Sequence, residues 1–252
     1  MDVVGDLLAR DRRSRDVALV TADGRERTYH DLITNAYKAA NVLRYLGVRE
    51  GATVAVDPTP RLHTTLAFLG AAALGAAVRF DPRAGIEAGD RAVLVDVADE
   101  PDTDPKAGTN LAVFGGPPER PETTHWEQEL WSENPGMPPS EVAPDDAAIR
   151  DGPDTVVSHR RLLALAMSVA TTDRIASGTR VVLRSDFADP RAVAVGIVSP
   201  LAVGGTVVLP GETAAQSGDA TADPRGEIAV TATAQFETPE PRRVALSSLS
   251  TR

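Results

Sequence analysis

The feature that most constrains the fold is a short apolar run, a helical pattern and a second apolar run that follow one another between residues 53 and 80. Thr53–Val56 predicts a buried strand, and Arg61–Leu74 predicts a helix because its apolar residues recur at helical spacing. Gly75 ends this helix, and Ala77–Phe80 predicts a second strand. A strand, a crossover helix and a second strand of this length form a right-handed unit with parallel strands. We therefore expect an α/β fold with a largely parallel sheet flanked by helices.

The segment before this unit predicts a hairpin that leads into an amphipathic helix. Val17–Thr21 and Arg25–Thr28 have strand composition on either side of a turn, and Thr28 can cap the helix that follows. Small or apolar residues then recur at alternating spacings of four and three, so they lie on one helix face. They are Leu32, Ala36, Ala39, Leu43 and Leu46, and Gly47 supplies the stop.

The rest of the chain continues the alternation of strands and helices. Further strands are expected at Ala92–Val95, Leu111–Phe114, Val181–Arg184, Thr206–Leu209, Glu227–Thr231 and Arg243–Leu246. Further helices are expected at His125–Ser132, Ser158–Thr172 and Arg191–Leu201. We predict a single domain over residues 1–252, with possible subdomains 1–145 and 146–252 and a flexible surface loop over 211–225.

Composition restricts the classes of ligand. The chain has 252 residues, is 42% hydrophobic and carries a formal charge of −10. Only Lys38 and Lys106 are lysines, and this acidic, arginine-over-lysine composition resembles that of proteins from salt-adapted archaea. Nucleic acids and anionic membranes attract basic surfaces, so neither is expected as a partner.

Metal and thiol chemistry find no support in the sequence. There is no cysteine, and the four histidines, His30, His63, His125 and His159, show no metal-ligand spacing. His63, close to the start of an expected helix, is predicted to be a solvated surface residue. The first residues lack a basic start followed by a long apolar run, so no secretory signal is expected and a cytoplasmic location is predicted.

Several stretches resemble a single enzyme family. Arg27–Val56 combines Thr-Tyr, a helix, Leu-Gly-Val and a buried strand; Leu74–Arg83 reads LGAAVRFDPR; and Arg191–Leu209 combines an apolar helix, two glycines and a strand. With Asp145–Leu163, these stretches are similar to the front half of the adenylate-forming (AMP-binding, acyl-CoA synthetase-like) enzymes. The resemblance implies the fold of the N-terminal subdomains of acyl-CoA synthetases.

Asp145–Leu163 resembles the family's phosphate-binding loop with its middle removed. In the family, a buried strand leads into a loop of the type Thr-Ser-Gly-Thr-Thr-Gly-x-Pro-Lys-Gly, and a Ser/Thr-His pair opens the next helix. Here only Arg-Asp-Gly-Pro-Asp remains between Ile149 and Thr155. The resemblance places vestigial phosphate-loop positions at Asp151, Gly152, Ser158 and His159.

A phosphate cradle needs converging backbone N–H groups and usually a lysine. The shortened segment has one glycine, one proline, no lysine and two carboxylates. We therefore expect an ordinary acidic turn between a strand and a helix. In this interpretation Ser158 is the helix N-cap and His159 lies in the first helical turn.

The remaining chemical motifs of the family are also not found in the sequence. There is no Gly-Tyr-Gly-x-Thr-Glu-like nucleotide segment, no ribose-binding Asp in a Thr-Gly-Asp context and no C-terminal lid with a catalytic lysine. We therefore expect no catalytic residue, no cofactor and no metal. The leading hypothesis is a catalytically silent relative of AMP-dependent acyl-CoA synthetases that acts as a binding or regulatory protein.

The expected partners follow from this hypothesis. They are a protein partner or a second copy of the chain, covering the face that the missing half would meet, or a weakly bound acyl or nucleotide-like ligand. An alternative is a split adenylate-forming ligase whose C-terminal half is supplied by another chain. A third possibility is an unrelated α/β binding or regulatory domain.

Overall fold

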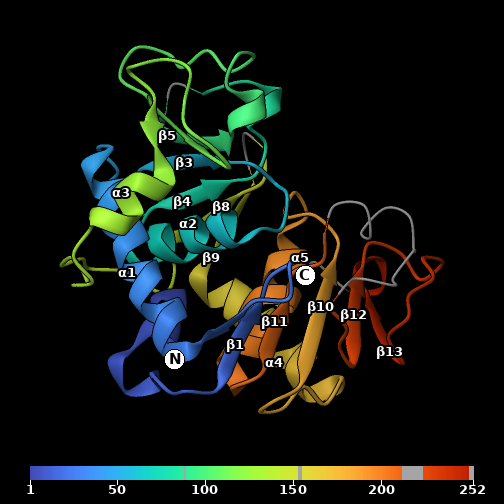
Figure 1. Ribbon diagram of the computed structural model, residues 1–252. Coiled ribbons are helices and arrows are strands. Elements are labelled where there is room, and N and C mark those ends of the chain that lie inside the picture. The colour runs from blue at the N-terminus through green and yellow to red at the C-terminus, as the bar shows by residue number, and fades with distance from the viewer. Residues whose placement is uncertain (88, 153–154, 212–223, 250–252) are drawn as a thin grey trace. The chain divides into compact units, whose positions relative to one another are not determined.

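The computed structural model describes residues 1–87, 89–152, 155–211 and 224–249 (Figure 1). The chain folds into two compact units, each assembled from several segments. Unit 1 contains residues 1–8, 33–58 and 63–159, and unit 2 contains residues 9–32, 59–62 and 160–252. Most of the surface loop expected over 211–225 lies outside the described residues. Within the described ranges, no helix is long and apolar enough to cross a membrane.

Unit 1 is built on a seven-stranded sheet, counted over its described residues, in the order β7-β6-β5-β3-β4-β8-β9. Every neighbouring pair is parallel except β8 and β9, which form an antiparallel hairpin at one edge. The strands are β3 (Thr53–Val56), β4 (Ala77–Arg79), β5 (Asp90–Asp96), β6 (Asn110–Phe114), β7 (Thr124–His125), β8 (Ala147–Arg150) and β9 (Val156–Ser158).

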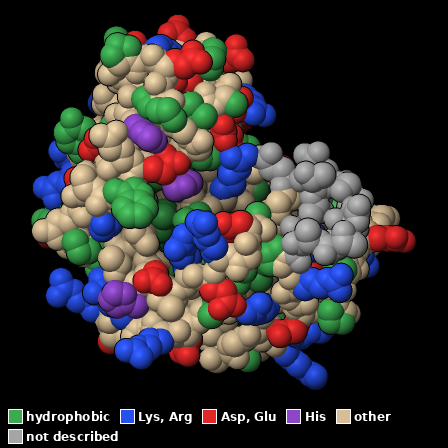
Figure 2. Space-filling model, in the orientation of Figure 1, with side chains coloured by type: hydrophobic (Ala, Val, Ile, Leu, Met, Phe, Trp, Pro, Cys, Tyr) green, Lys and Arg blue, Asp and Glu red, His purple; other side chains and the backbone are tan. Residues whose placement is uncertain are grey.

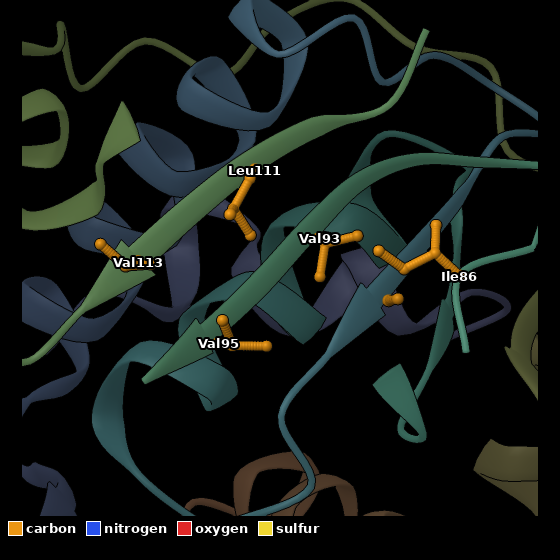
Figure 3. Close-up of a cluster of buried hydrophobic side chains, with 6 residues drawn as sticks. Ile86, Val93, Val95, Leu111 and Val113 are labelled. Carbon is orange, nitrogen blue, oxygen red and sulfur yellow. The ribbon is translucent and has the colours of Figure 1, made fainter. Parts of the chain in front are cut away.

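One face of this sheet carries an aliphatic core. Because side chains alternate between the two faces of a strand, residues two apart on β5 and β6 point to the same side. Figure 3 shows the side chains of this cluster, which is joined by Ile86 from the loop before β5. Its buried members are Ala55, Ile86, Val93, Val95, Leu111 and Val113.

Unit 2 is built on a six-stranded sheet, again counted over described residues, in the order β13-β12-β10-β11-β1-β2. It is parallel except for the β1–β2 hairpin at its edge. The strands are β1 (Val17–Val20), β2 (Glu26–Thr28), β10 (Arg180–Arg184), β11 (Thr206–Val208), β12 (Ile228–Thr231) and β13 (Arg242–Ala245). The expected α/β class is thus confirmed, with two largely parallel sheets where one was expected.

The helices lie close to their predicted positions. They are α1 (Tyr29–Tyr45), α2 (Leu62–Ala73), α3 (Trp126–Ser132), α4 (His159–Thr172), α5 (Pro190–Val193) and α6 (Ser199–Val203). Short 3₁₀ turns occur at Val4–Leu8, Arg10–Arg12, Pro82–Ala84, Val97–Asp99 and Leu246–Ser248. The predicted inward face of α1 is confirmed, because its four predicted residues within the helix are buried, and Leu46, just after the helix, is buried too.

The start of α1 is fixed by a reciprocal cap. Thr28 Oγ1 accepts a hydrogen bond from the Asp31 N–H at 3.1 Å, and Asp31 Oδ2 accepts one from the Thr28 N–H at 3.2 Å. Two N–H groups at the start of the helix are thereby satisfied. The capping role predicted for Thr28 is confirmed.

The helix predicted over Arg191–Leu201 is interrupted by a π-helical turn at Ala194–Val198, between α5 and α6. Pro200 has no N–H to donate to the carbonyl four residues earlier, so the regular ladder cannot continue through it. The Ser199 N–H bonds to the Ala194 carbonyl instead.

Helices α1 and α2 approach closely at Gly70, within unit 1. A Cβ atom at this position would lie 2.8 Å from the Ala40 backbone nitrogen and 3.1 Å from the Ala39 carbonyl carbon. These neighbours are backbone atoms, which cannot move aside as a flexible side chain can. Gly70 therefore sets the distance at which the two helices pack.

We predict that Gly70→Ala lowers the free energy of unfolding by about 1–3 kcal/mol, the usual magnitude for overpacking a core. Gly89→Ala is the matched control, because a Cβ there meets nothing within 4 Å. Chemical denaturation of the two variants measures the difference. Equal stability of both variants would show that the helix contact tolerates a methyl group.

Candidate functional site

The shortened phosphate-loop segment forms the β8–β9 hairpin. Ala147 pairs with Ser158, Ile149 with Val157 and Arg150 with Val156. The Asp151 N–H donates to the Thr155 carbonyl at 2.9 Å, which closes the turn. The strand–turn–helix interpretation therefore needs a correction, because a second strand lies between the turn and α4. Thr155, Val156 and Val157 form too short a run to be recognised as a strand from sequence alone.

Asp151 and Gly152 lie at the exposed tip of this hairpin. Gly152 adopts a left-handed conformation with φ of 77°, and a Cβ there would meet no atom within 4 Å. The Asp151 N–H is used by the turn itself. Among the described residues of the tip, the backbone N–H groups therefore do not form an enclosed site for an anion. Pro153 and Asp154 lie outside the described residues.

Ser158 and His159 lie at the other end of the hairpin. Ser158 is the last residue of β9 and pairs with Ala147, the first residue of β8. At about 3.3 Å per strand residue, β9 separates Ser158 from the tip by roughly 10 Å. The structure therefore does not gather the four predicted positions, Asp151, Gly152, Ser158 and His159, into one site.

His159 is a buried structural residue of unit 1. Its ring Nδ1 atom accepts a hydrogen bond from the Val4 N–H at 3.2 Å. The backbone N–H of His159 donates to the Asp146 carbonyl at 3.1 Å. Burial lowers the pKa of His159 below its ordinary value of 6.5, although the carboxylates of Asp146 and Asp6 oppose the shift. The neutral imidazole therefore joins the amino-terminal 3₁₀ turn to the start of α4.

A second group of polar side chains lies at the carboxyl edge of the unit 1 sheet. His63, near the start of α2, stacks on Phe114 at the end of β6, with ring centroids 5.6 Å apart. Its side chain is 24% exposed. His63 is therefore partly buried where a solvated residue was predicted, because Phe114, which is distant in sequence, stacks on its ring.

Glu127 lies between two imidazoles in this group. One carboxylate oxygen is 3.6 Å from His63 Nε2, and the other is 3.6 Å from His125 Nε2. The Gly115 N–H donates to the first oxygen at 2.6 Å and holds the carboxylate in place. Glu127 thus contacts one histidine in the first turn of α2 and another at the end of β7.

This histidine–glutamate group was missed in the sequence, although a signal for it existed. Phe114 and His125 end parallel strands, and ligands of open α/β sheets bind at that edge. Across the described ranges, no group of three or more His, Asp or Glu side chains could hold a metal ion. The contacts of this group tie α2, β7 and α3 together at one edge of the unit 1 sheet.

The carboxyl edge of the unit 2 sheet contains a buried ion pair. Arg184, the last residue of β10, donates two hydrogen bonds to Glu240, from Nε at 2.9 Å and from Nη2 at 2.7 Å. The side chains are 1% and 0% exposed. Two parallel hydrogen bonds between a guanidinium and a carboxylate form a strong pairing of fixed geometry. The space beside the carboxyl end of β10 is therefore filled by the side chains of Arg184 and Glu240.

Comparisons with known proteins agree with this architecture. The model of a family described as AMP-binding enzyme matches residues 8–149. A search of curated proteins found no match. Among solved structures, the anthranilate CoA ligase AuaEII, in complex with anthranoyl-AMP, is 18% identical with a TM-score of 0.74. The aligned region covers 91% of this chain and 49% of that one.

Two further structures are similar. The N-terminal domain of FACL13 from Mycobacterium tuberculosis is 20% identical with a TM-score of 0.74, covering 92% of this chain and 63% of that one. The nonribosomal peptide synthetase FmoA3, in its AMPPNP-bound form, is 24% identical with a TM-score of 0.68, covering 83% and 23%. The chain thus spans about half of the CoA ligase and less than two thirds of the FACL13 domain, and at these identities the likeness shows the fold.

We predict that His159 makes stability depend on pH. Because the folded pKa is lowered, the full stabilisation is present above pH 6.5 and is lost as the pH falls through the folded pKa. His159→Gln, which cannot titrate in this range, should show a smaller loss of unfolding free energy between pH 7 and pH 5. His30→Gln, at a histidine whose side chain is 60% exposed, is the control and should keep the wild-type slope. Identical slopes for wild type and His159→Gln would contradict the assignment.

The buried ion pair gives a second prediction. Glu240→Ala leaves Arg184 buried without its carboxylate, which should lower the free energy of unfolding by about 3–5 kcal/mol. Glu26→Ala is the matched control, because the Glu26–Arg180 pair is 49% and 39% exposed and should contribute about 1 kcal/mol or less. Urea denaturation of both variants provides the comparison. A loss below 1 kcal/mol at Glu240 would show that water or another group replaces the carboxylate.

Proposed function

Because this chain belongs to the AMP-binding enzyme family, whose model matches residues 8–149, we propose that it is a catalytically silent relative of the AMP-dependent ligases. In this proposal the chain keeps the α/β scaffold and acts as a binding or regulatory protein. The observation that carries the proposal is the turn between β8 and β9, where the Asp151 N–H is bonded to the Thr155 carbonyl.

The physical reason is the loss of phosphate ligands. Each charge-assisted hydrogen bond to a phosphate contributes about 1.5–3 kcal/mol, so losing two or three weakens nucleotide binding by about 10²- to 10⁴-fold or more. Residues 150–154 include no lysine, and Pro153 has no N–H to donate. Asp151 and Asp154 add two negative charges that repel a triphosphate.

The binding role concerns a protein partner, a second copy of the chain or a weakly bound acyl or nucleotide-like ligand. Two large aromatic side chains of unit 1 support a protein partner, since Trp131 is 83% exposed and Tyr45 is 74% exposed. Trp and Tyr are enriched where protein interfaces gain most of their binding energy. The face shown in Figure 2 intersperses acidic, basic and hydrophobic side chains.

Isothermal titration with Mg-ATP and with a non-hydrolysable acyl-adenylate tests catalytic silence. We expect no saturable binding tighter than about 1 mM, given the loss of phosphate ligands. A matched variant replaces residues 150–154 with the family's Thr-Ser-Gly-Thr-Thr-Gly-x-Pro-Lys-Gly loop, and its ATP affinity should rise. Micromolar binding of either ligand to the unaltered chain would contradict the proposal.

A second candidate function is a split ligase, in which another chain supplies the C-terminal half. The observation that motivates it is the family match over residues 8–149, which the silent relative shares. This candidate requires carboxylate-dependent exchange of pyrophosphate into ATP when the two halves meet. The measurement uses an extract of the source cells, depleted of this chain and then supplied with it again. Exchange that returns with the chain favours the split ligase, and exchange that does not return favours the silent relative.

A further inference from the structure

A cavity of about 220 Å³ lies within unit 1, beside strand β8 of the hairpin. Small residues and ionisable side chains share its lining. Its lining residues are Glu50, Gly51, Gly75, Ala77, Asp146, Ala147 and Arg150. At about 220 Å³ it is smaller than the roughly 300–1,000 Å³ of sites for drug-sized ligands, so any ligand must be small.

Two glycines explain why the cavity stays open. Gly51 and Gly75 both have φ of 73°, a conformation that side-chain-bearing residues rarely adopt, and the Gly51 N–H donates to the Gly75 carbonyl at 2.8 Å. A Cβ at Gly75 would lie 3.2 Å from Glu50 Cγ and 3.4 Å from Val142 Cγ2. Both positions therefore require glycine, and no side chain from either one fills the space.

The cationic group of the cavity is held in a fixed place. Arg150 Nε donates to Thr53 Oγ1 at 3.1 Å, so the guanidinium is anchored at one corner, and the side chain is half-buried. A guanidinium has a planar fork of donors that suits a carboxylate. Arg150 is also the first residue of the segment that replaces the phosphate loop.

Two anionic groups share the same lining. Asp146 is held by a hydrogen bond from the Ala143 N–H to its Oδ2 atom at 2.7 Å, and the exposed Glu50 lies beside the turn that carries Gly51. With Arg150, the ionisable lining groups carry two negative charges and one positive charge. The net charge of the three groups is −1, so a simple anion would be repelled, whereas a simple cation would offer no carboxylate to the guanidinium.

We propose that this cavity binds a small zwitterion with one ammonium and one carboxylate group, of the amino-acid class. The ligand carboxylate accepts hydrogen bonds from the Arg150 guanidinium, and its ammonium donates to Glu50 and Asp146. Complementary charge on both groups makes the zwitterion better matched than either half alone. The proposal goes beyond the proposed function, because it assigns a ligand class to a cavity that the silent-relative proposal does not use.

Isothermal titration with glycine, β-alanine and 4-aminobutyrate tests the proposal, since their charged groups are separated by increasing distances. A ligand of so few atoms is expected to bind with a Kd of about 0.1–1 mM. Acetate and methylammonium, which carry one charged group each, should bind at least tenfold more weakly than the best zwitterion. Equal affinity for acetate would overturn the proposal in favour of a plain anion site.

Variants of the lining complete the experiment. Arg150→Gln and Glu50→Gln should each weaken the best zwitterion about tenfold or more, one charged contact being worth about 1.5–3 kcal/mol. Ala147→Val adds volume to the lining without altering its charge and should abolish binding of the zwitterion. This variant still tests the proposal if a charge variant fails to fold. Arg91→Gln, at an exposed residue of β5 outside the lining, is the control and should bind normally. No zwitterion binding below 10 mM, or unchanged binding in Arg150→Gln and Ala147→Val, would overturn the proposal.

Discussion

Antiparallel pairing at one edge of each sheet is the constraint on which the rest of the structure depends. A parallel sheet leaves backbone donors and acceptors open at its edges, and here a hairpin pairs with one edge in both units. The β1–β2 hairpin leads directly into α1, and the β8–β9 hairpin leads directly into α4. Each hairpin therefore completes a sheet and also sets where a helix begins. The β8–β9 hairpin completes its sheet and positions α4 only while its two strands stay in register. The same register fixes the conformation of the connecting turn, and hence what the turn can bind.

The sequence predicted those parts of the fold that depend on neighbouring residues. The period of the apolar residues in α1 and the Thr28 cap are local signals, and both correspond to the structure. The α/β class follows from the strand–helix–strand unit between Thr53 and Phe80, because the twist of the strands makes such a crossover right-handed and its strands parallel. Strand β9 was missed because it has only three residues and is stabilised by pairing with β8.

The residues of the candidate sites were harder to predict because their environment is tertiary. His159 was expected in the first turn of a helix, and nothing in its neighbours shows that the Val4 N–H meets its ring. His63 is covered by Phe114, a residue on a different strand. In a chain with 36 acidic residues, composition also cannot single out Glu240 as the carboxylate that pairs with Arg184. Sequence patterns report periodicity and turn chemistry, whereas burial of a polar group depends on contacts between distant segments.

The scaffold can lose a phosphate loop without losing stability, since the loop and the core use different interactions. Asp151 and Gly152 are exposed and contribute no buried surface, whereas the sheet beneath them is held by aliphatic side chains such as Val93 and Leu111. Shortening a flexible loop by half also lowers the entropic cost of closing it, by about 0.6 kcal/mol. A long glycine-rich loop therefore persists only where phosphate binding is selected, and a short turn is the more stable connection once that selection ends. Under the proposed function, the shorter turn therefore costs the fold nothing, and Arg150 is available to the ligand proposed for the cavity.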